Sequence, residues 1–147
     1  MSSLLLALCI GLGGAGGAVC RSYALDAIDA VLAKRKFVHQ TPNCFDRICS
    51  WLPVAVLLVN AAACFLAGVF GGLGVQGCAQ AFLLAGFCGG FSTLSTVNLD
   101  AARLFSGQVN GAGQSALVAG RTHAALYLFA TYAVALGAAA MGLFLTR

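Results

Sequence analysis

Four long apolar stretches are the feature that most constrains how this 147-residue chain can fold. Of all residues, 61% are hydrophobic and only 8% are charged, and the mean hydropathy is +0.94, whereas soluble domains are about 25% charged. Eight Lys and Arg residues cannot cover a soluble globule of this size, but four helices of roughly 20 residues each use up most of the apolar content. The composition therefore predicts an all-α, multi-pass protein of the plasma membrane with a single four-helix domain.

The predicted spans cover residues 4–23, 52–73, 79–105 and 124–145. In the first span, Gly13 and Gly17 form a small-xxx-small pair that lets another helix approach closely. No basic residues precede this span, so we interpret it as a transmembrane helix rather than a signal peptide. Residues 26–51 carry most of the charged side chains and are predicted to be the only long polar loop, with a helical extension at its start.

The third span is interrupted by a glycine and hydroxyl motif, Gly89-Gly90-Phe91-Ser92-Thr93-Leu94-Ser95-Thr96. Two adjacent glycines followed by four hydroxyl side chains predict a broken helix. Such a break is tolerated at membrane depth only where it is buried in protein or lines a cavity. The alternative is that the hydroxyls bond to carbonyls of their own helix.

Asn60 is the most informative single residue, because an amide within an apolar helix costs free energy unless its polar atoms find partners. Its NH₂ group either donates to an anion or makes a hydrogen bond to another helix. Arg21 has two similar interpretations. It either extends to the membrane interface or fixes the first helix against the third.

The polar residues within the spans limit the possible functions. No Asp, Glu or Lys lies in the middle of a span, since Asp100 and Arg21 lie towards the ends. A proton-coupled exporter needs an ionisable group at depth. This argues against one alternative function, that of a small multidrug-type transporter subunit. Another alternative, a non-conducting membrane scaffold, leaves Asn60 without a function. Hydroxyls, one amide, aromatic rings and free backbone can instead solvate a small ion.

Other classes receive little support from the sequence. The basic residues are scattered without interleaved aromatic residues, so we expect no nucleic-acid partner. Of the seven cysteines, five lie in or beside apolar stretches, and Cys44 and Cys49 near His39 match no established zinc spacing. We expect no catalytic residues and no enzymatic activity.

The motif of the third span resembles a family signature. Residues Gly86-Phe87-Cys88-Gly89-Gly90-Phe91-Ser92-Thr93-Leu94-Ser95-Thr96-Val97 resemble the third helix of Fluc-type fluoride channels, the CrcB-like family. The stretches 13–21 and 59–68, and Tyr127 with Thr131, are similar to the family's other three helices. The resemblance implies a passive channel that exports cytoplasmic fluoride, built as a dimer of four-helix subunits inserted in opposite orientations.

By position, the resemblance also implies roles for individual residues. The fluoride pathway would comprise Asn60, Ser95, Thr96, Tyr127 and Thr131. A central structural sodium ion would be held by the backbone carbonyls of Gly89 and Ser92, and Arg21 and Asp100 would occupy structural positions.

Two features of the chain predict the nature of the dimer. The family typically has phenylalanine where this chain has Leu94 and Val97, and neither side chain offers the electropositive edge of a ring. Seven basic residues fall on the side of the 1–2 and 3–4 connections, against Arg147 on the other side, which predicts termini outside the cell. These seven are Arg21, Lys34, Arg35, Lys36, Arg47, Arg103 and Arg121. We therefore predict a heterodimer with an oppositely oriented paralogous subunit; a homodimer with altered pores is the alternative.

Overall fold

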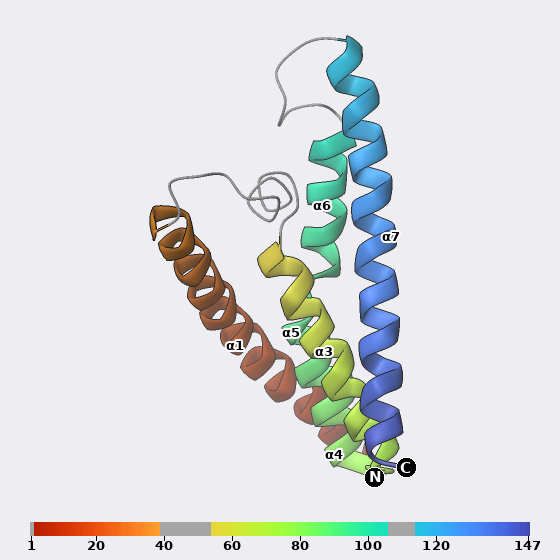
Figure 1. Cartoon of the computed structure of the whole chain (residues 1–147). Coiled ribbons are helices and arrows are strands. Elements are labelled where there is room, and N and C mark those ends of the chain that lie inside the picture. The colour runs from red at the N-terminus through yellow and green to blue at the C-terminus, as the bar shows by residue number, and fades with distance from the viewer. Residues whose placement is uncertain (1, 39–53, 106–113) are drawn as a thin grey trace.

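The computed structural model describes residues 2–38, 54–105 and 114–147, and every element within these ranges is helical (Figure 1). In chain order the elements are α1 (Ser3–Val38), α3 (Val54–Gly72), α4 (Gly77–Gln80), the π-helical segment η1 (Ala81–Cys88), α5 (Gly89–Phe91), α6 (Leu94–Phe105) and α7 (Gln114–Leu145). The segments α4, η1, α5 and α6 together make up the third of four long helical units.

Each of the four units is long and apolar enough to cross a membrane. The candidate spans are Ser3–Lys34, Val54–Gly72, Gly77–Arg103 and Arg121–Leu145. Large apolar side chains cover the outside of the bundle, and Leu12, Phe129 and Phe144 are 67%, 75% and 81% exposed. Helices that are apolar all round are typical of membrane spans. The chain is therefore a multi-pass membrane protein, as its composition predicts.

The first helix is longer than the predicted first span. It does not end near Tyr23 but continues to Val38, so Asp26, Asp29 and Lys34 lie on α1. The sequence from Ala24 to Val38 contains mostly good helix formers and neither glycine nor proline, so nothing local ends the helix near Tyr23. The rest of the predicted polar loop, including Cys44 and Cys49, lies outside the described residues.

Glycines set the distance between neighbouring helices. A Cβ atom on Gly13 would collide with the carbonyl of Phe82, and one on Gly17 would collide with the third helix as well. This confirms that the small-xxx-small pair allows close approach of another helix. A glycine also allows close packing of α3 on α7, which lie side by side in Figure 1. Gly68 lies directly against the backbone of Ala139.

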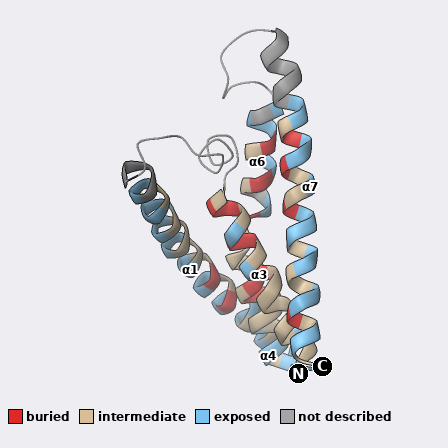
Figure 2. Cartoon of the chain, viewed as in Figure 1, coloured by how far each residue is buried: buried red, intermediate tan, exposed pale blue. Residues whose placement is uncertain are grey.

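The third helix is broken where the sequence predicts it. Helix α5 ends at Phe91, the backbone of Ser92 is extended (φ −71°, ψ 156°), and α6 begins at Leu94. Beside the break lies a small core of Val56, Val97, Ala101, Ala124 and Tyr127. Figure 2 shows that these buried positions lie where α3, α6 and α7 come together. The break therefore sits against the core of the bundle, with protein on at least one side.

Candidate functional site

A pair of hydrogen bonds joins Asn60 of α3 to Thr93 in the break. The Asn60 Oδ1 atom accepts the backbone N–H of Thr93 at 2.7 Å, and Nδ2 donates to the Thr93 hydroxyl at 2.9 Å. Because a backbone N–H can only donate, the atom that faces it must be the amide oxygen, which fixes the orientation of the side chain. Both residues are buried, with Asn60 7% and Thr93 1% exposed. Of the two interpretations of Asn60, the geometry thus supports a hydrogen bond to another helix.

The hydrogen bond to Asn60 also explains how the break is maintained. In a continuous helix, the N–H of Thr93 would donate to the carbonyl of Gly89, four residues earlier. Here that N–H donates to Asn60, and the donor to the Gly89 carbonyl among the described residues is the hydroxyl of Ser92, at 3.2 Å. A side chain from another helix thereby substitutes for the missing turn of α-helix.

Arg21 contacts the same break from α1. Its Nη1 atom donates to the backbone carbonyl of Ser92 at 3.3 Å. Arg21 is therefore not an interfacial residue at the end of the first span but joins the first helix to the third, in agreement with the second of its two interpretations. Arg21 is partly buried and lies within α1, so it should not be counted among the loop residues that set orientation.

The carbonyls of Gly89 and Ser92 can be tested as ligands for a hard cation. Carbonyl oxygens are suitable ligands for such ions, and the Gly89 carbonyl accepts the neutral Ser92 hydroxyl in place of its helical donor, which leaves it one lone pair. The Ser92 carbonyl retains one lone pair, but the guanidinium of Arg21 occupies the other and brings positive charge close to it. Gly89 therefore fits a cation site better than Ser92, and two carbonyls are fewer oxygens than hard cations usually take.

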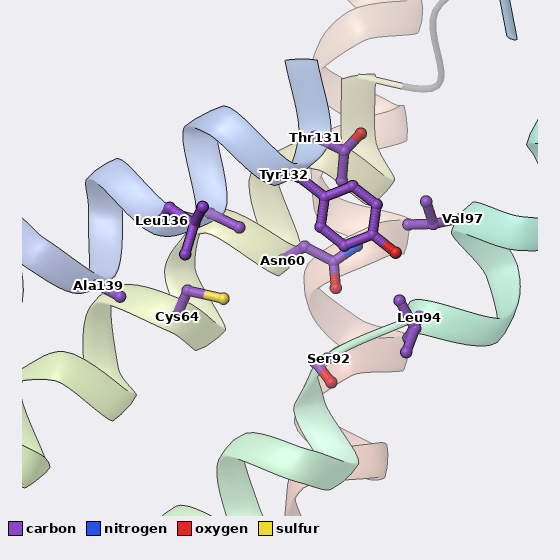
Figure 3. A pocket seen from close by; sticks show the side chains of 10 residues that line it. Asn60, Cys64, Ser92, Leu94, Val97, Thr131, Tyr132, Leu136 and Ala139 are labelled. Atoms are coloured by element: carbon purple, nitrogen blue, oxygen red, sulfur yellow. The ribbon is translucent and has the colours of Figure 1, made fainter. Parts of the chain in front are cut away.

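A groove of about 320 Å³ opens beside Asn60, between α3, α7 and the break (Figure 3). It is lined by Asn60, Cys64, Ser92, Leu94, Val97, Thr131, Tyr132, Ala135, Leu136 and Ala139. None of these side chains is acidic. Leu94 and Val97, the two departures from the family pattern, both line it, but Val97 is buried in the core while Leu94 is 55% exposed. The wall of the groove is mostly apolar, with hydroxyl and amide groups at a few points.

Tyr127 and Thr131 lie one turn apart on α7, and both are buried. The hydroxyl of Thr131 donates to the backbone carbonyl of Tyr127 at 2.8 Å, and Thr131 lines the groove. The Tyr127 hydroxyl lies in the core and has no hydrogen-bond partner among the described residues. A buried hydroxyl without a partner carries a desolvation cost, so this group is available as a donor to a ligand or a water molecule.

The remaining predicted positions do not gather at the groove. Thr96 is partly buried on α6 but is not one of the residues that line the groove, and the side chain of Ser95 lies outside the described residues. Asp100 forms an ion pair with Arg103 of the same helix, at 3.7 Å.

Two residues of the site are absent from the predicted fluoride pathway. Thr93 is the partner of Asn60 through both backbone and side chain. Its place in the hydroxyl motif, three residues after Gly90, was the signal that could have found it. Tyr132 lines the groove, and it follows Thr131 in the sequence. Its aromatic ring supplies part of the wall opposite the break (Figure 3).

Comparison with known proteins places the chain among membrane proteins of one family. The family model of "CrcB-like protein, Camphor Resistance (CrcB)" matches residues 8–143. The chain is 44% identical over 57 residues to fluoride-specific ion channel FluC 1 of Streptococcus pneumoniae, which is 39% of this chain and 52% of that protein. It is 32% identical over 96 residues to FluC 2 of Haloarcula marismortui, 65% of each chain. It is also 35% identical over 100 residues to FluC of Thermococcus onnurineus, 65% of this chain and 67% of that one. The chain thus aligns with about half the length of the first of these relatives.

Proposed function

The chain belongs to the CrcB-like protein family, and from this premise we propose that it is a subunit of a passive, fluoride-selective ion channel that exports cytoplasmic fluoride. Its curated relatives carry the name fluoride-specific ion channel. The observation that carries the proposal is the hydrogen-bonded pair of Asn60 and Thr93, which holds open a helix break beside a groove with hydrogen-bond donors.

The groups around the groove suit a small anion. A strongly hydrated anion enters a protein only where hydrogen-bond donors replace its water. An amide NH₂ carries two donors, and the bond to Thr93 uses one of those on Asn60. The Tyr132 hydroxyl adds a further donor to the same wall, whereas the Thr131 hydroxyl donates to the backbone carbonyl of Tyr127. An anion in the groove would therefore meet donors and no carboxylate.

The same set of residues argues for passive transport. Coupling to protons needs an ionisable group at depth, and the described residues that line the groove include no Asp, Glu, His, Lys or Arg. Asp100 is paired with Arg103 on α6 and does not line the groove. A small multidrug-type transporter therefore gains no support from these residues.

We further propose that a second, oppositely oriented subunit completes the site. The groove is open on one side, and Leu94 at its rim is exposed. Phenylalanine rings from a paralogous partner would supply the electropositive edges that Leu94 and Val97 lack. The partner's break would also add carbonyl oxygens to those of Gly89 and Ser92. Together these oxygens would bind a central structural sodium ion.

Charge placement supports a partner that differs from this chain. Both termini lie at the same end of the bundle as α4 (Figure 1), where Arg147 is the basic residue of the described chain. Lys34, Arg103 and Arg121 lie towards the opposite end. Even without Arg21, this distribution favours one orientation, with the termini outside. Two copies of this chain would then face the same way, so an inverted dimer calls for a paralogue.

Growth of bacteria in fluoride tests the proposal in cells. A strain without its own fluoride channels is transformed with this chain alone, or with this chain and the paralogous subunit from the same genome. We expect the pair to restore growth in fluoride and Asn60→Asp to abolish the rescue. If neither the chain nor the pair restores growth although both reach the membrane, the proposed export of fluoride is wrong.

A further inference from the structure

Two cysteines lie beside each other at a close contact between α1 and the third helix. Gly13 of α1 lies against the carbonyl of Phe82, and a Cβ atom on Gly86 would lie 2.7 Å from the carbonyl of Ile10, so the two backbones nearly touch. Cys9 is one turn before Gly13, and Cys78 is one turn before Phe82, on the same faces of the two helices. The side chains of Cys9 and Cys78 interact with each other, and neither residue is part of a disulfide in the structure.

This pair lies at the end of the bundle that carries both termini. Cys78 is the second residue of α4 and directly follows the turn between α3 and α4. That turn is exposed at Leu73, Gly74 and Gln76. Figure 1 shows α4 beside the N- and C-termini, so the pair lies near one membrane surface.

The other cysteines of the described chain differ from this pair in access or in neighbours. Cys88 is buried, with 6% exposure, and Cys64 is partly exposed but lies on α3, where it lines the groove. Cys20 is exposed on α1, but it lies eleven residues, or about three turns, beyond Cys9. Cys9 and Cys78 are each partly exposed. They combine proximity with access, which disulfide formation requires.

We propose that Cys9 and Cys78 form a disulfide site that closes by exchange with a low-molecular-weight disulfide on the side of the membrane where the termini lie. The thiolate of Cys78 attacks one sulfur of the small disulfide, forms a mixed disulfide and releases one thiol. The thiolate of Cys9 then attacks the Cys78 sulfur and releases the second thiol. Two protein thiols are oxidised, one small disulfide is reduced to two thiols, and the two protons pass to those thiols.

The bridge would fix the start of α1 to the start of the third helix. Both helices meet again at the break, where Arg21 of α1 bonds to the carbonyl of Ser92. If the termini are outside, as the charge distribution favours, the site faces the compartment in which disulfides persist. The proposal goes beyond fluoride conduction and does not depend on it.

Peptide mapping of the full-length protein tests the site. Membranes that contain the wild type, Cys9→Ser, Cys78→Ser or Cys20→Ser are treated with oxidised glutathione. Free thiols are then blocked with N-ethylmaleimide, and the protein is digested with trypsin and chymotrypsin for mass spectrometry. We expect a peptide linked through Cys9 and Cys78 in the wild type and in Cys20→Ser. We expect its loss in Cys9→Ser, in Cys78→Ser and after reduction with dithiothreitol before blocking.

The linked peptide identifies the partner of Cys78 directly, so the wild type and Cys20→Ser decide the question even if another variant folds poorly. Size-exclusion chromatography checks that each variant is folded. A Cys78 that remains free, stays as a mixed disulfide with glutathione or links to a cysteine other than Cys9 would overturn the proposal.

Discussion

The amide of Asn60 holds the backbone and the hydroxyl of Thr93 at the same time, through hydrogen bonds of 2.7 and 2.9 Å. The first of these bonds replaces the helical bond that the N–H of Thr93 would otherwise make to Gly89. They connect α3 to the broken third helix at the edge of the groove. The break is therefore a specified feature with its own polar partner, and most of the predictions below follow from it.

Asn60→Asp should reduce fluoride flux by at least about tenfold, equivalent to about 1.4 kcal/mol. A carboxylate keeps an acceptor for the N–H of Thr93 but adds a negative charge that repels an anion in a medium of low dielectric constant. The measurement is fluoride efflux from liposomes. Ala62→Ser, on an exposed position of the same helix, serves as the control and should conduct normally. Unchanged flux in a folded Asn60→Asp protein would mean that Asn60 has a structural role only.

Thr93→Val should lower the thermal stability of the protein, by about 1–3 kcal/mol of folding free energy. Valine has nearly the shape of threonine, but it leaves the buried Nδ2 of Asn60 without its acceptor. Thr93→Ser keeps the hydroxyl and should remain closer to the wild type. Thermal unfolding in detergent, followed by size-exclusion chromatography, compares the three proteins. Equal melting temperatures for valine and wild type would show that the side-chain bond contributes nothing.

Gly13→Ala should disrupt the packing of α1 on the third helix, whereas Gly16→Ala should not. The added methyl group at Gly13 meets the carbonyl of Phe82, but the one at Gly16 has nothing within 4 Å. In an exposed helical position, alanine is favoured over glycine by about 1 kcal/mol, so Gly16→Ala should be as stable as the wild type or more stable. The two variants are compared by thermal unfolding. The prediction is wrong if Gly13→Ala melts no earlier than Gly16→Ala.

These outcomes bear on what a sequence alone can predict. The four spans and the broken third helix were predictable, because the length of apolar runs and a double glycine before hydroxyls are local signals. A helical extension beyond the first span was also predicted, and α1 confirms it. Its end at Val38 was not predictable, because charged residues such as Asp26 and Lys34 are compatible with helix formation and mark no boundary.

The partners of the polar residues were also beyond sequence reasoning. Asn60 bonds to a residue 33 positions away, and Arg21 to one 71 positions away. Only the packing of the helices brings these groups together. The roles of Ser95 and Thr96, the sodium ion and the inverted heterodimer stay predictions.

Sodium should raise the melting temperature of the assembled protein if the carbonyls of Gly89 and Ser92 contribute to a cation site. A ligand that binds only the folded state raises the free energy of unfolding. Once the ligand concentration exceeds the dissociation constant, this gain grows with the logarithm of the concentration. Thermal unfolding is measured in sodium chloride and in N-methyl-D-glucamine chloride at the same ionic strength. Identical curves over a wide range of sodium concentrations would argue against the site.

Fluoride efflux from liposomes is the most direct test of the account. The assembled protein is reconstituted into liposomes loaded with potassium fluoride and potassium chloride, valinomycin is added to carry the counter-charge, and both anions are followed with electrodes. The account predicts that fluoride leaves down its gradient without a proton gradient, while chloride stays inside. Efflux that requires a proton gradient, or chloride efflux as rapid as that of fluoride, would contradict it.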